Sequence, residues 1–153
     1  MDDKVRQKLL DFRDSTRVKV RFNDTDAMGI VHFKNYLVYF DDGFVSFMNS
    51  LLAPKRIEET VQEGVAFGVK KIEIVYEGSV QFGDYVIVES QIKTIGKSSL
   101  TFQHSLYRET NNSLIAKVEC VRLAMEVKSN KLVSVDEFFK KYLKFNMGWF
   151  KKN

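Results

Sequence analysis

The sequence has few of the residues that stabilise small proteins through disulfides or bound metal ions. Its 153 residues include one cysteine, one proline, one tryptophan and two histidines. The single cysteine, Cys120, has no partner for an internal disulfide, and two histidines without clustered ligands argue against a structural zinc site. No apolar run is as long as a membrane span, and the charged N-terminal segment differs from a signal peptide. These absences predict a reducing compartment, and we expect a cytoplasmic protein.

The composition is that of an ordinary globular domain. Hydrophobic residues make up 44% of the chain and charged residues 29%, fractions that fit neither a disordered chain nor a coiled coil. The length suits one domain over residues 1–153, with peripheral ends at 1–15 and 146–153. The net charge is only +4, and the basic residues are scattered without an aromatic and basic platform. We therefore expect no specific nucleic-acid partner.

The spacing of apolar residues predicts a strand, a long helix and then four more strands. Alternation over residues 16–23 predicts the first strand, and spacings of three and four from Phe33 to Leu51 predict a helix over 33–52. Weaker helical patterns lie at both ends of the chain, over 4–13 and 135–145. Alternating residues predict four further strands, joined by short turns, over 65–77, 85–95, 98–109 and 114–128.

The long helix decides the predicted fold class. Tyr36, Val38, Tyr39 and Val45 extend its apolar character onto other faces. This pattern predicts a helix that is wrapped on several sides. Consecutive strands with short turns form a largely antiparallel sheet, so the class is α+β. A curved sheet around a central helix is the hotdog fold, which we expect here.

The segment from Asp24 to Tyr36 joins the first strand to the long helix and is the candidate for chemistry. The first turn of a helix leaves backbone amides free, and their dipoles favour an anion or a polarised carbonyl. A carboxylate just upstream, Asp24 or Asp26, can act there as a general base or as a nucleophile toward an acyl carbon. On the residues alone, a structural role in Asx turns or helix capping is the commoner one.

The same segment resembles the opening signature of the 4-hydroxybenzoyl-CoA thioesterase family of hotdog-fold acyl-CoA thioesterases. The pattern D-T-D-x-x-G-x-V stands here as Asp24, Thr25, Asp26, Gly29 and Val31, followed by Asn35 and Tyr36. A looser likeness extends over residues 16–140. The resemblance implies hydrolysis of an acyl-CoA thioester to a free acid and coenzyme A, with no metal and no separate cofactor.

The resemblance also implies roles for individual residues. Asp26 is the catalytic carboxylate, which either activates water or attacks the thioester carbonyl, and the backbone amide of Phe33 polarises that carbonyl. Gly29 and Val31 fall beside the substrate. In the branch associated with the bacterial Tol-Pal envelope system, many relatives have histidine at the position of Phe33, whereas here it is His32. This histidine either orients the substrate or tunes Asp26, or it is a hydrogen-bonded residue behind those that contact the substrate.

Several residues outside this segment also receive predictions. Relatives contact the nucleotide of coenzyme A through a turn of basic and hydroxyl residues, which falls here on Lys97, Ser98 and Ser99. A merely solvated lysine in a hairpin is equally compatible with the residues alone. We expect His104 to be a hydrogen-bonded core or interface residue and Cys120 to be a small buried one. Asp41 is expected to make a structural hydrogen bond.

Two other functions stay open at this point. A hydratase or dehydratase on the same fold needs a histidine and a carboxylate, which His32 with Asp26 or Asp41 can supply. The fold can also bind acyl-CoA or an acyl carrier without turnover, with Asp26 only holding the turn. Family members place the site between two subunits, so the resemblance implies a homodimer or a homotetramer.

Overall fold

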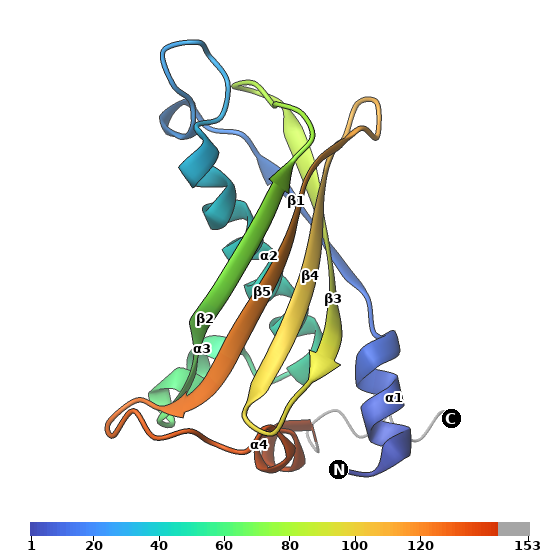
Figure 1. Ribbon diagram of the computed structural model, residues 1–153, viewed down its shortest axis with the longest axis vertical. Coiled ribbons are helices and arrows are strands. Elements are labelled where there is room, and N and C mark those ends of the chain that lie inside the picture. The colour runs from blue at the N-terminus through green and yellow to red at the C-terminus, as the bar shows by residue number, and fades with distance from the viewer. Residues whose placement is uncertain (144–153) are drawn as a thin grey trace.

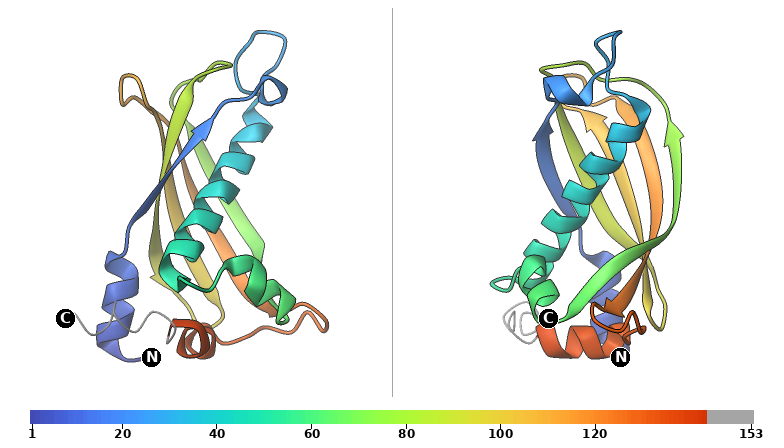
Figure 2. Two further views of the ribbon diagram at one scale, coloured as in Figure 1. Left: turned by 180° about the vertical axis from the view of Figure 1, so that it is seen from behind. Right: turned by 90° about the vertical axis from the view of Figure 1, so that its left-hand side faces the viewer.

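A five-stranded antiparallel sheet curves around one long helix in the computed structural model, which describes residues 1–143 (Figures 1 and 2). The strand order is β1-β3-β4-β5-β2, so β1 and β2 form the two edges of the sheet. The strands are β1 (Asp14–Lys19), β2 (Val65–Tyr76), β3 (Tyr85–Ile95), β4 (Ser99–Arg108) and β5 (Leu114–Glu126).

Four α-helices and two single turns of 3₁₀-helix complete the described chain. The long helix α2 lies on one face of the sheet, and the three short helices gather at its C-terminal end (Figure 1). The helices are α1 (Asp3–Asp11), α2 (Tyr36–Leu52), α3 (Ile57–Gln62) and α4 (Val135–Tyr142), and the 3₁₀ turns are η1 (Phe22–Asp24) and η2 (Phe33–Asn35).

The observed elements follow the predicted order and differ at two boundaries near the candidate site. The first strand ends at Lys19 rather than at residue 23, because the Asp24 carboxylate accepts the Arg21 amide at 3.0 Å and turns the chain into η1. The predicted helix over 33–52 is divided into η2 and α2. The last residues of the predicted helix over 135–145 lie outside the described residues.

The sheet curves around α2 as the predicted fold requires, and the side of the helix that faces away from the sheet is partly exposed. Tyr36 and Tyr39 are buried as expected, but Val38 is 41% exposed and Val45 is 37% exposed. The sheet curves only part of the way around the helix, which packs chiefly on β1, β3 and β4 (Figure 2). The strand β2 therefore keeps exposed apolar residues, including Ile72. Ile72 lies opposite the buried Cys120 of β5, so its side chain is on the same face of the sheet as the helix.

Aromatic residues fill the core at the C-terminal end of α2. Phe44 and Phe47 each meet the Phe102 ring edge to face, with ring centroids 5.3 Å apart. Phe67 of β2 meets Phe138 of α4 in the same way at 5.0 Å. Such geometry adds to the stabilisation that burial of large rings provides. This end of the molecule is thus the main packed core.

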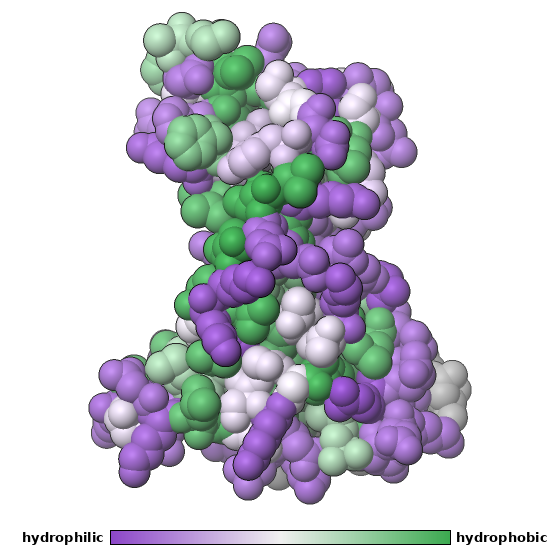
Figure 3. Space-filling model, in the orientation of Figure 1, coloured by the Kyte–Doolittle hydropathy of each residue, from purple (hydrophilic) through white to green (hydrophobic). Residues whose placement is uncertain are grey.

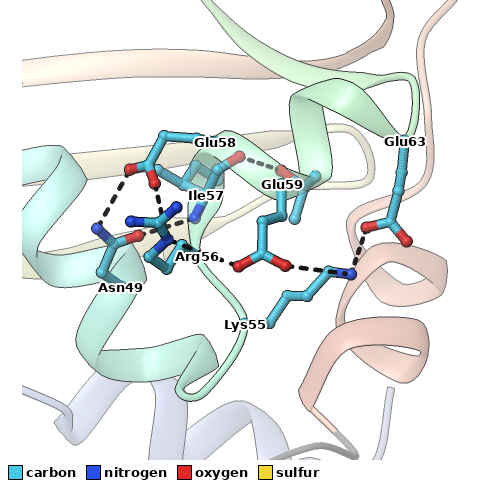
Figure 4. Close-up of polar contacts among 8 residues, drawn as sticks. Asn49, Lys55, Arg56, Ile57, Glu58, Glu59 and Glu63 are labelled. Carbon is cyan, nitrogen blue, oxygen red and sulfur yellow. Dashed lines mark hydrogen bonds and ion pairs between the residues drawn. The ribbon is translucent and has the colours of Figure 1, made fainter.

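Polar contacts fix the position of α2 along its own axis. The Asp14 carboxylate, at the start of β1, accepts the hydroxyls of Ser46 at 2.7 Å and Ser50 at 2.8 Å, one helical turn apart. Near the C-terminal end of α2, the Asn49 side chain accepts the amide of Ile57, the first residue of α3, at 2.8 Å, as Figure 4 shows. The helix is therefore tied both to an edge strand and to α3.

Gly43 marks a close approach of α2 to the sheet. A Cβ atom at this position would lie 2.6 Å from Val88 Cγ1 and 3.0 Å from Ser90 Oγ. Beneath it, Ser90 Oγ and His104 Nδ1 form a buried hydrogen bond of 2.6 Å, and the Phe102 ring stacks on the imidazole. Burial first, and the charge of Arg122 second, lower the pKa of His104 to about 3. His104 is the hydrogen-bonded core residue that the sequence predicted.

Candidate active site

The segment before α2 is folded into a short ladder of its own. The Asp26 amide donates to Ile30 O at 2.9 Å, and the His32 amide donates to Asp24 O at 3.0 Å. Gly29 makes the turn between these arms with φ +80°, a conformation that favours glycine. The ladder brings the Asp26 loop and the start of α2 to one end of the molecule, at the top of Figure 1.

Asp24 holds this loop in place. Its buried carboxylate accepts the Tyr39 hydroxyl at 2.8 Å, and its backbone carbonyl accepts the Asn35 side chain at 2.8 Å. Burial first, and the hydrogen bond to Asp24 second, raise the pKa of Tyr39 far above its ordinary value, so the phenol remains a donor. Sequence reasoning missed this role of Tyr39, which was considered only for the apolar character that it gives to the helix.

Asp26 combines a structural contact with a free oxygen. One carboxylate oxygen, Oδ1, accepts the Met28 amide at 2.8 Å and closes an Asx turn. The other oxygen, Oδ2, has no hydrogen-bond donor among residues 1–143. The side chain is half-buried. The Asx turn thus fixes the carboxylate while one oxygen stays available to a reacting group.

His32 and Phe33 form the entry to the helix. His32 caps η2, since its Nδ1 atom accepts the Lys34 amide at 3.3 Å, which leaves the proton of the neutral ring on Nε2. The imidazole stacks on the Phe33 ring, which is 66% exposed. Within residues 1–143, the Phe33 amide has no hydrogen-bond acceptor. It is one of the free donors that a helix start provides.

The connection between β2 and β3 runs beside this loop and supports it. The Val31 amide donates to Val80 O at 2.9 Å, and Ile30 forms an isolated antiparallel bridge with Gln81. The Tyr76 hydroxyl donates to Phe33 O at 2.9 Å. These contacts join residues that are more than forty positions apart in the sequence, and no local sequence pattern indicates them. The Val31 side chain itself is buried in the core, so only its backbone lines the loop.

The turn predicted to contact coenzyme A lies at the other end of the molecule. Lys97, Ser98 and Ser99 join β3 to β4 beside α4, where Lys97 O accepts the Val135 amide at 2.8 Å (Figure 1). The ten residues of β4 separate this turn from the Asp26 end by roughly 33 Å at the rise of a strand. A single chain therefore does not bring the two predicted groups together.

The remaining predicted residues have structural surroundings. Asp41 Oδ1 pairs with an Arg122 amino group at 2.6 Å, so its carboxylate makes a structural contact as expected. Cys120 is buried, and burial raises the pKa of its thiol, which confirms the prediction of a small core residue. In the described range 1–143, no three His, Cys, Asp or Glu side chains group as metal ligands, and no helix is long and apolar enough to cross a membrane.

Exposed aromatic and apolar side chains surround the Asp26 loop. Phe22 meets Phe82 edge to face with centroids 5.7 Å apart, and both rings are largely exposed, as are Met28 and Phe33. The open hollow beside β1 and α2, of about 630 Å³, borders this region at Arg21 but is lined by neither Asp26 nor Phe33. The loop thus presents an apolar surface with one free carboxylate oxygen and one free amide.

This sheet order, the helix that it holds and the carboxylate loop before that helix define a hotdog-fold protein, as the sequence predicted. The profile of the thioesterase-like superfamily matches residues 20–143. The chain belongs to this superfamily.

Individual relatives agree with this assignment. The chain is 29% identical to the acyl-CoA thioesterase YbgC of Haemophilus influenzae over 117 residues, which are 75% of this chain and 85% of that protein. A DHNA-CoA thioesterase from Staphylococcus aureus superimposes with a TM-score of 0.79 at 15% identity, with 89% of each chain covered. The 4-hydroxybenzoyl-CoA thioesterase of a Pseudomonas species gives a TM-score of 0.73 at 18% identity and covers 85% of this chain and 98% of its own. The predicted fold and family are confirmed.

Proposed function

We propose that this protein is an acyl-CoA thioesterase that hydrolyses an acyl-CoA thioester to a carboxylic acid and coenzyme A. One observation carries the proposal: Asp26 Oδ2 and the Phe33 amide are both unengaged within residues 1–143, and both belong to the loop before α2. The membership of the chain in the thioesterase-like superfamily supports the same reaction. The names of its relatives indicate coenzyme A thioesters as the substrate class.

The reaction uses the carboxylate and the amide together. The Phe33 N–H donates to the thioester carbonyl oxygen and stabilises the negative charge that develops there. In one route, Asp26 Oδ2 takes a proton from water, the resulting hydroxide attacks the carbonyl carbon, and the C–S bond breaks. The coenzyme A thiolate then takes the proton. In the other route, Oδ2 attacks the carbon itself, and the C–S bond breaks to release the coenzyme A thiolate and leave a mixed anhydride. Water then hydrolyses the anhydride to the free acid and the Asp26 carboxylate, and the thiolate takes the proton that is released. In this scheme, His32 donates a hydrogen bond through its Nε2–H and so orients the substrate.

A second copy of the chain completes the site in our proposal. The edge strand β2 keeps an open backbone edge and exposes Val69, Val75 and Tyr76. Figure 3 shows hydrophobic side chains gathered across the middle of the face on which β2 lies. Open apolar edges are usually covered in native proteins, because they otherwise pair with other chains. We therefore assign β2 as the contact of a homodimer, with a tetramer formed from two dimers.

The charges of β2 suit pairing with its own copy. If a two-fold axis passes through Ile72, antiparallel strands place Lys71 of each chain opposite Glu73 of the other, a favourable cross-strand pair. The test is light scattering on the wild type and on Val75→Lys, with Thr101→Lys on β4 as the control. Monomers in the β2 variant alone support this interface. A wild-type monomer, or dimers in both variants, contradicts it.

The turn of Lys97, Ser98 and Ser99 contacts coenzyme A on a neighbouring subunit in this proposal. Its distance from Asp26 within one chain is the reason, since the phosphates and the thioester belong to one substrate molecule. Replacing Lys97 by alanine then raises KM about threefold to tenfold and leaves kcat unchanged, with a smaller effect at high salt. An unchanged KM at low salt contradicts the assignment. Lys93→Ala, on the adjacent strand, is the matched control.

The deciding experiment measures thiol release from acetyl-CoA, palmitoyl-CoA and benzoyl-CoA by the wild type and by Asp26→Asn. We expect the variant to lose at least about a hundredfold in turnover, the scale of a lost general base, with an unchanged unfolding midpoint. Asp11→Asn, on α1, is the matched control. Equal activity of Asp26→Asn and the wild type contradicts the role of Asp26.

A second candidate function rests on the Asx turn of Asp26. Because Oδ1 already holds the Met28 amide, the carboxylate can serve the loop alone, in a module that binds acyl-CoA or an acyl carrier without turnover. Tight binding of all three thioesters without thiol release favours this function. Addition of water to an unsaturated acyl-CoA without thiol release favours a hydratase instead.

A further inference from the structure

We propose that Tyr76 is a positioning residue that sets the orientation of the oxyanion donor at Phe33. Tyr76 is the last residue of the edge strand β2, and its hydroxyl donates to the Phe33 carbonyl oxygen at 2.9 Å. Its ring also meets the buried Tyr36 ring edge to face, with centroids 5.3 Å apart. The ring contact fixes where the hydroxyl lies. This inference rests on the proposed function, because it concerns the amide that we assign to the thioester carbonyl.

The turn that carries Phe33 is held by short-range contacts, because the Asn35 amide donates to His32 O at 2.8 Å and His32 Nδ1 accepts the Lys34 amide at 3.3 Å. The 3₁₀ turn η2 spans three residues, and the hydrogen bonds of such turns are poorer than those of an α-helix. Asn35, the N-cap of α2, makes no side-chain capping bond. The nearest backbone contact from the β2–β3 connection reaches Val31, two residues upstream. The Tyr76 hydroxyl adds a contact from β2, and it acts on the peptide group that follows Phe33, next to the peptide group that carries the Phe33 N–H.

Loss of this hydroxyl should affect the reaction more than the fold. The Phe33 carbonyl lies near the surface, so water replaces the lost donor at small cost in stability. An oxyanion donor, in contrast, is effective because it is already oriented when charge develops. A donor with more rotational freedom stabilises the transition state less, whereas the bound ground state changes little. The effect should therefore appear in kcat rather than in KM.

The location of Tyr76 also connects the site to the sheet edge. Tyr76 pairs with Ala116 at the last position of the β2–β5 register and is 43% exposed. A displacement of β2 moves the hydroxyl and with it the Phe33 peptide. Whatever pairs with the edge of β2 thereby influences the oxyanion donor through one side chain.

The first test compares Tyr76→Phe with Tyr107→Phe. Tyr107 alternates with the buried Leu106 on β4 and faces away from α2, so it is a matched control. On the thioester that the wild type hydrolyses fastest among acetyl-CoA, palmitoyl-CoA and benzoyl-CoA, we expect Tyr76→Phe to lower kcat about tenfold. KM and the unfolding midpoint should stay at the wild-type values. An unchanged kcat, or a raised KM at constant kcat, overturns the proposal.

The second test does not need turnover. S-Acetonyl-CoA carries a ketone in place of the thioester and is not hydrolysed. In protein labelled with ¹⁵N-phenylalanine, the Phe33 amide signal is identified by its loss in Phe33→Leu. Adding S-acetonyl-CoA should shift this signal in the wild type and in Tyr107→Phe, and by less than half as much in Tyr76→Phe.

The two tests separate the two hypotheses. A shift that is equal in Tyr76→Phe and the wild type, or absent from the wild type, overturns the positioning role. If the shift behaves as expected but no thioester releases thiol, the positioning of the amide stands and the proposed hydrolysis fails. If thiol is released and Asp26→Asn is inactive while Tyr76→Phe behaves as the wild type, the hydrolysis stands and the role of Tyr76 fails.

Discussion

The two ends of α2 are held by different forces. At the C-terminal end, buried rings such as Phe47 and Phe102 pack edge to face, and three short helices surround them. At the N-terminal end, hydrogen bonds to Asp24 and from Tyr76 hold a loop whose own aromatic residue, Phe33, faces outward. The first end excludes water, and the second end leaves polar groups accessible.

With the site that we propose at Asp26 and Phe33, this difference separates stability from chemistry along one helix. Burial of large rings is the main favourable contribution to folding, and it needs no free polar group. A reacting carboxylate and an oxyanion donor, in contrast, must remain unpaired, which is costly inside a core. A rigid helix between the two ends lets the packed end support a loop that contributes little to stability itself. Substitutions at the two ends should therefore separate stability from activity, and the largest effect is expected in the packed end.

Truncation in the packed end should affect stability alone. Phe102 is fully buried and touches both Phe44 and Phe47, so Phe102→Ala should lower the free energy of unfolding by about 3 to 5 kcal/mol. Urea unfolding measures this loss. The kcat of the folded fraction should stay within about twofold of the wild type, because the site lies at the other end. A much larger drop in kcat would mean that the two ends are not independent.

Acid should weaken the middle of the helix through His104. Its pKa is lowered to about 3 from an ordinary value of 6.5, so above pH 6.5 the ring is neutral whether the chain is folded or unfolded. Below pH 6.5 the unfolded chain takes up a proton that the folded chain does not, and stability falls by about 1.4 kcal/mol per pH unit. By pH 4.5 this residue should account for roughly 2 to 3 kcal/mol.

The check is urea unfolding at pH 7 and pH 4.5 for the wild type and for His104→Gln. The variant should show a smaller difference between the two pH values. An NMR titration of the two histidines gives the same answer without a variant, since His104 should stay neutral at pH 4.5. A ring of His104 that titrates above pH 5 is the contrary result.

A methyl group at the close approach of helix and sheet should have an intermediate effect. In Gly43→Ala the new Cβ meets Val88 Cγ1 at 2.6 Å, so either the side chain or the helix must move. We expect a loss of about 1 to 3 kcal/mol in urea unfolding, the usual range for overpacking. If the helix moves, kcat falls as well, because α2 carries the loop. A loss of stability with constant kcat would show that Val88 moves instead.

The smallest effect on stability is expected at the loop itself. Tyr39→Phe removes the hydroxyl that donates to Asp24 and should cost about 1 to 2 kcal/mol. Unlike Phe102→Ala, this substitution should also lower kcat, because Asp24 holds the Asp26 ladder. Steady-state kinetics beside thermal unfolding test the contrast. Equal kcat values in Tyr39→Phe and the wild type would show that the contact with Asp24 does not influence the reaction.

Periodic patterns predicted the sheet and the helix well because burial imposes them residue by residue. The strand over 85–95 and the helix end at Leu52 follow directly from alternation and from the proline at position 54. The end of β1 was not predicted, because Val20 and Phe22 continue the alternating pattern. What stops the strand is the Asp24 carboxylate bound to the Arg21 amide, a contact that hydropathy does not describe.

The candidate site could be predicted only in part, for a related reason. Asp26 and Phe33 lie in one contiguous motif, which the family resemblance identifies. Tyr76 lies more than forty residues away from Phe33 and reaches it only because the β2–β3 connection folds back over the loop. The turn at Lys97 was assigned from the family resemblance alone. That assignment did not take into account the length of β4, which separates the turn from Asp26.

The contacts of Asp14 with Ser46 and Ser50 hold α2 at a fixed position, so the length of the helix sets where its N-terminal loop lies. Both hydroxyls lie on one face of the helix, one turn apart, so they fix its rotation as well as its axial position. One residue inserted between Tyr36 and Ser46 would advance the helix start by about 1.5 Å and rotate it by about 100° relative to that anchor. Insertions and deletions in related sequences should therefore avoid this stretch of helix and collect in largely exposed turns such as 110–113.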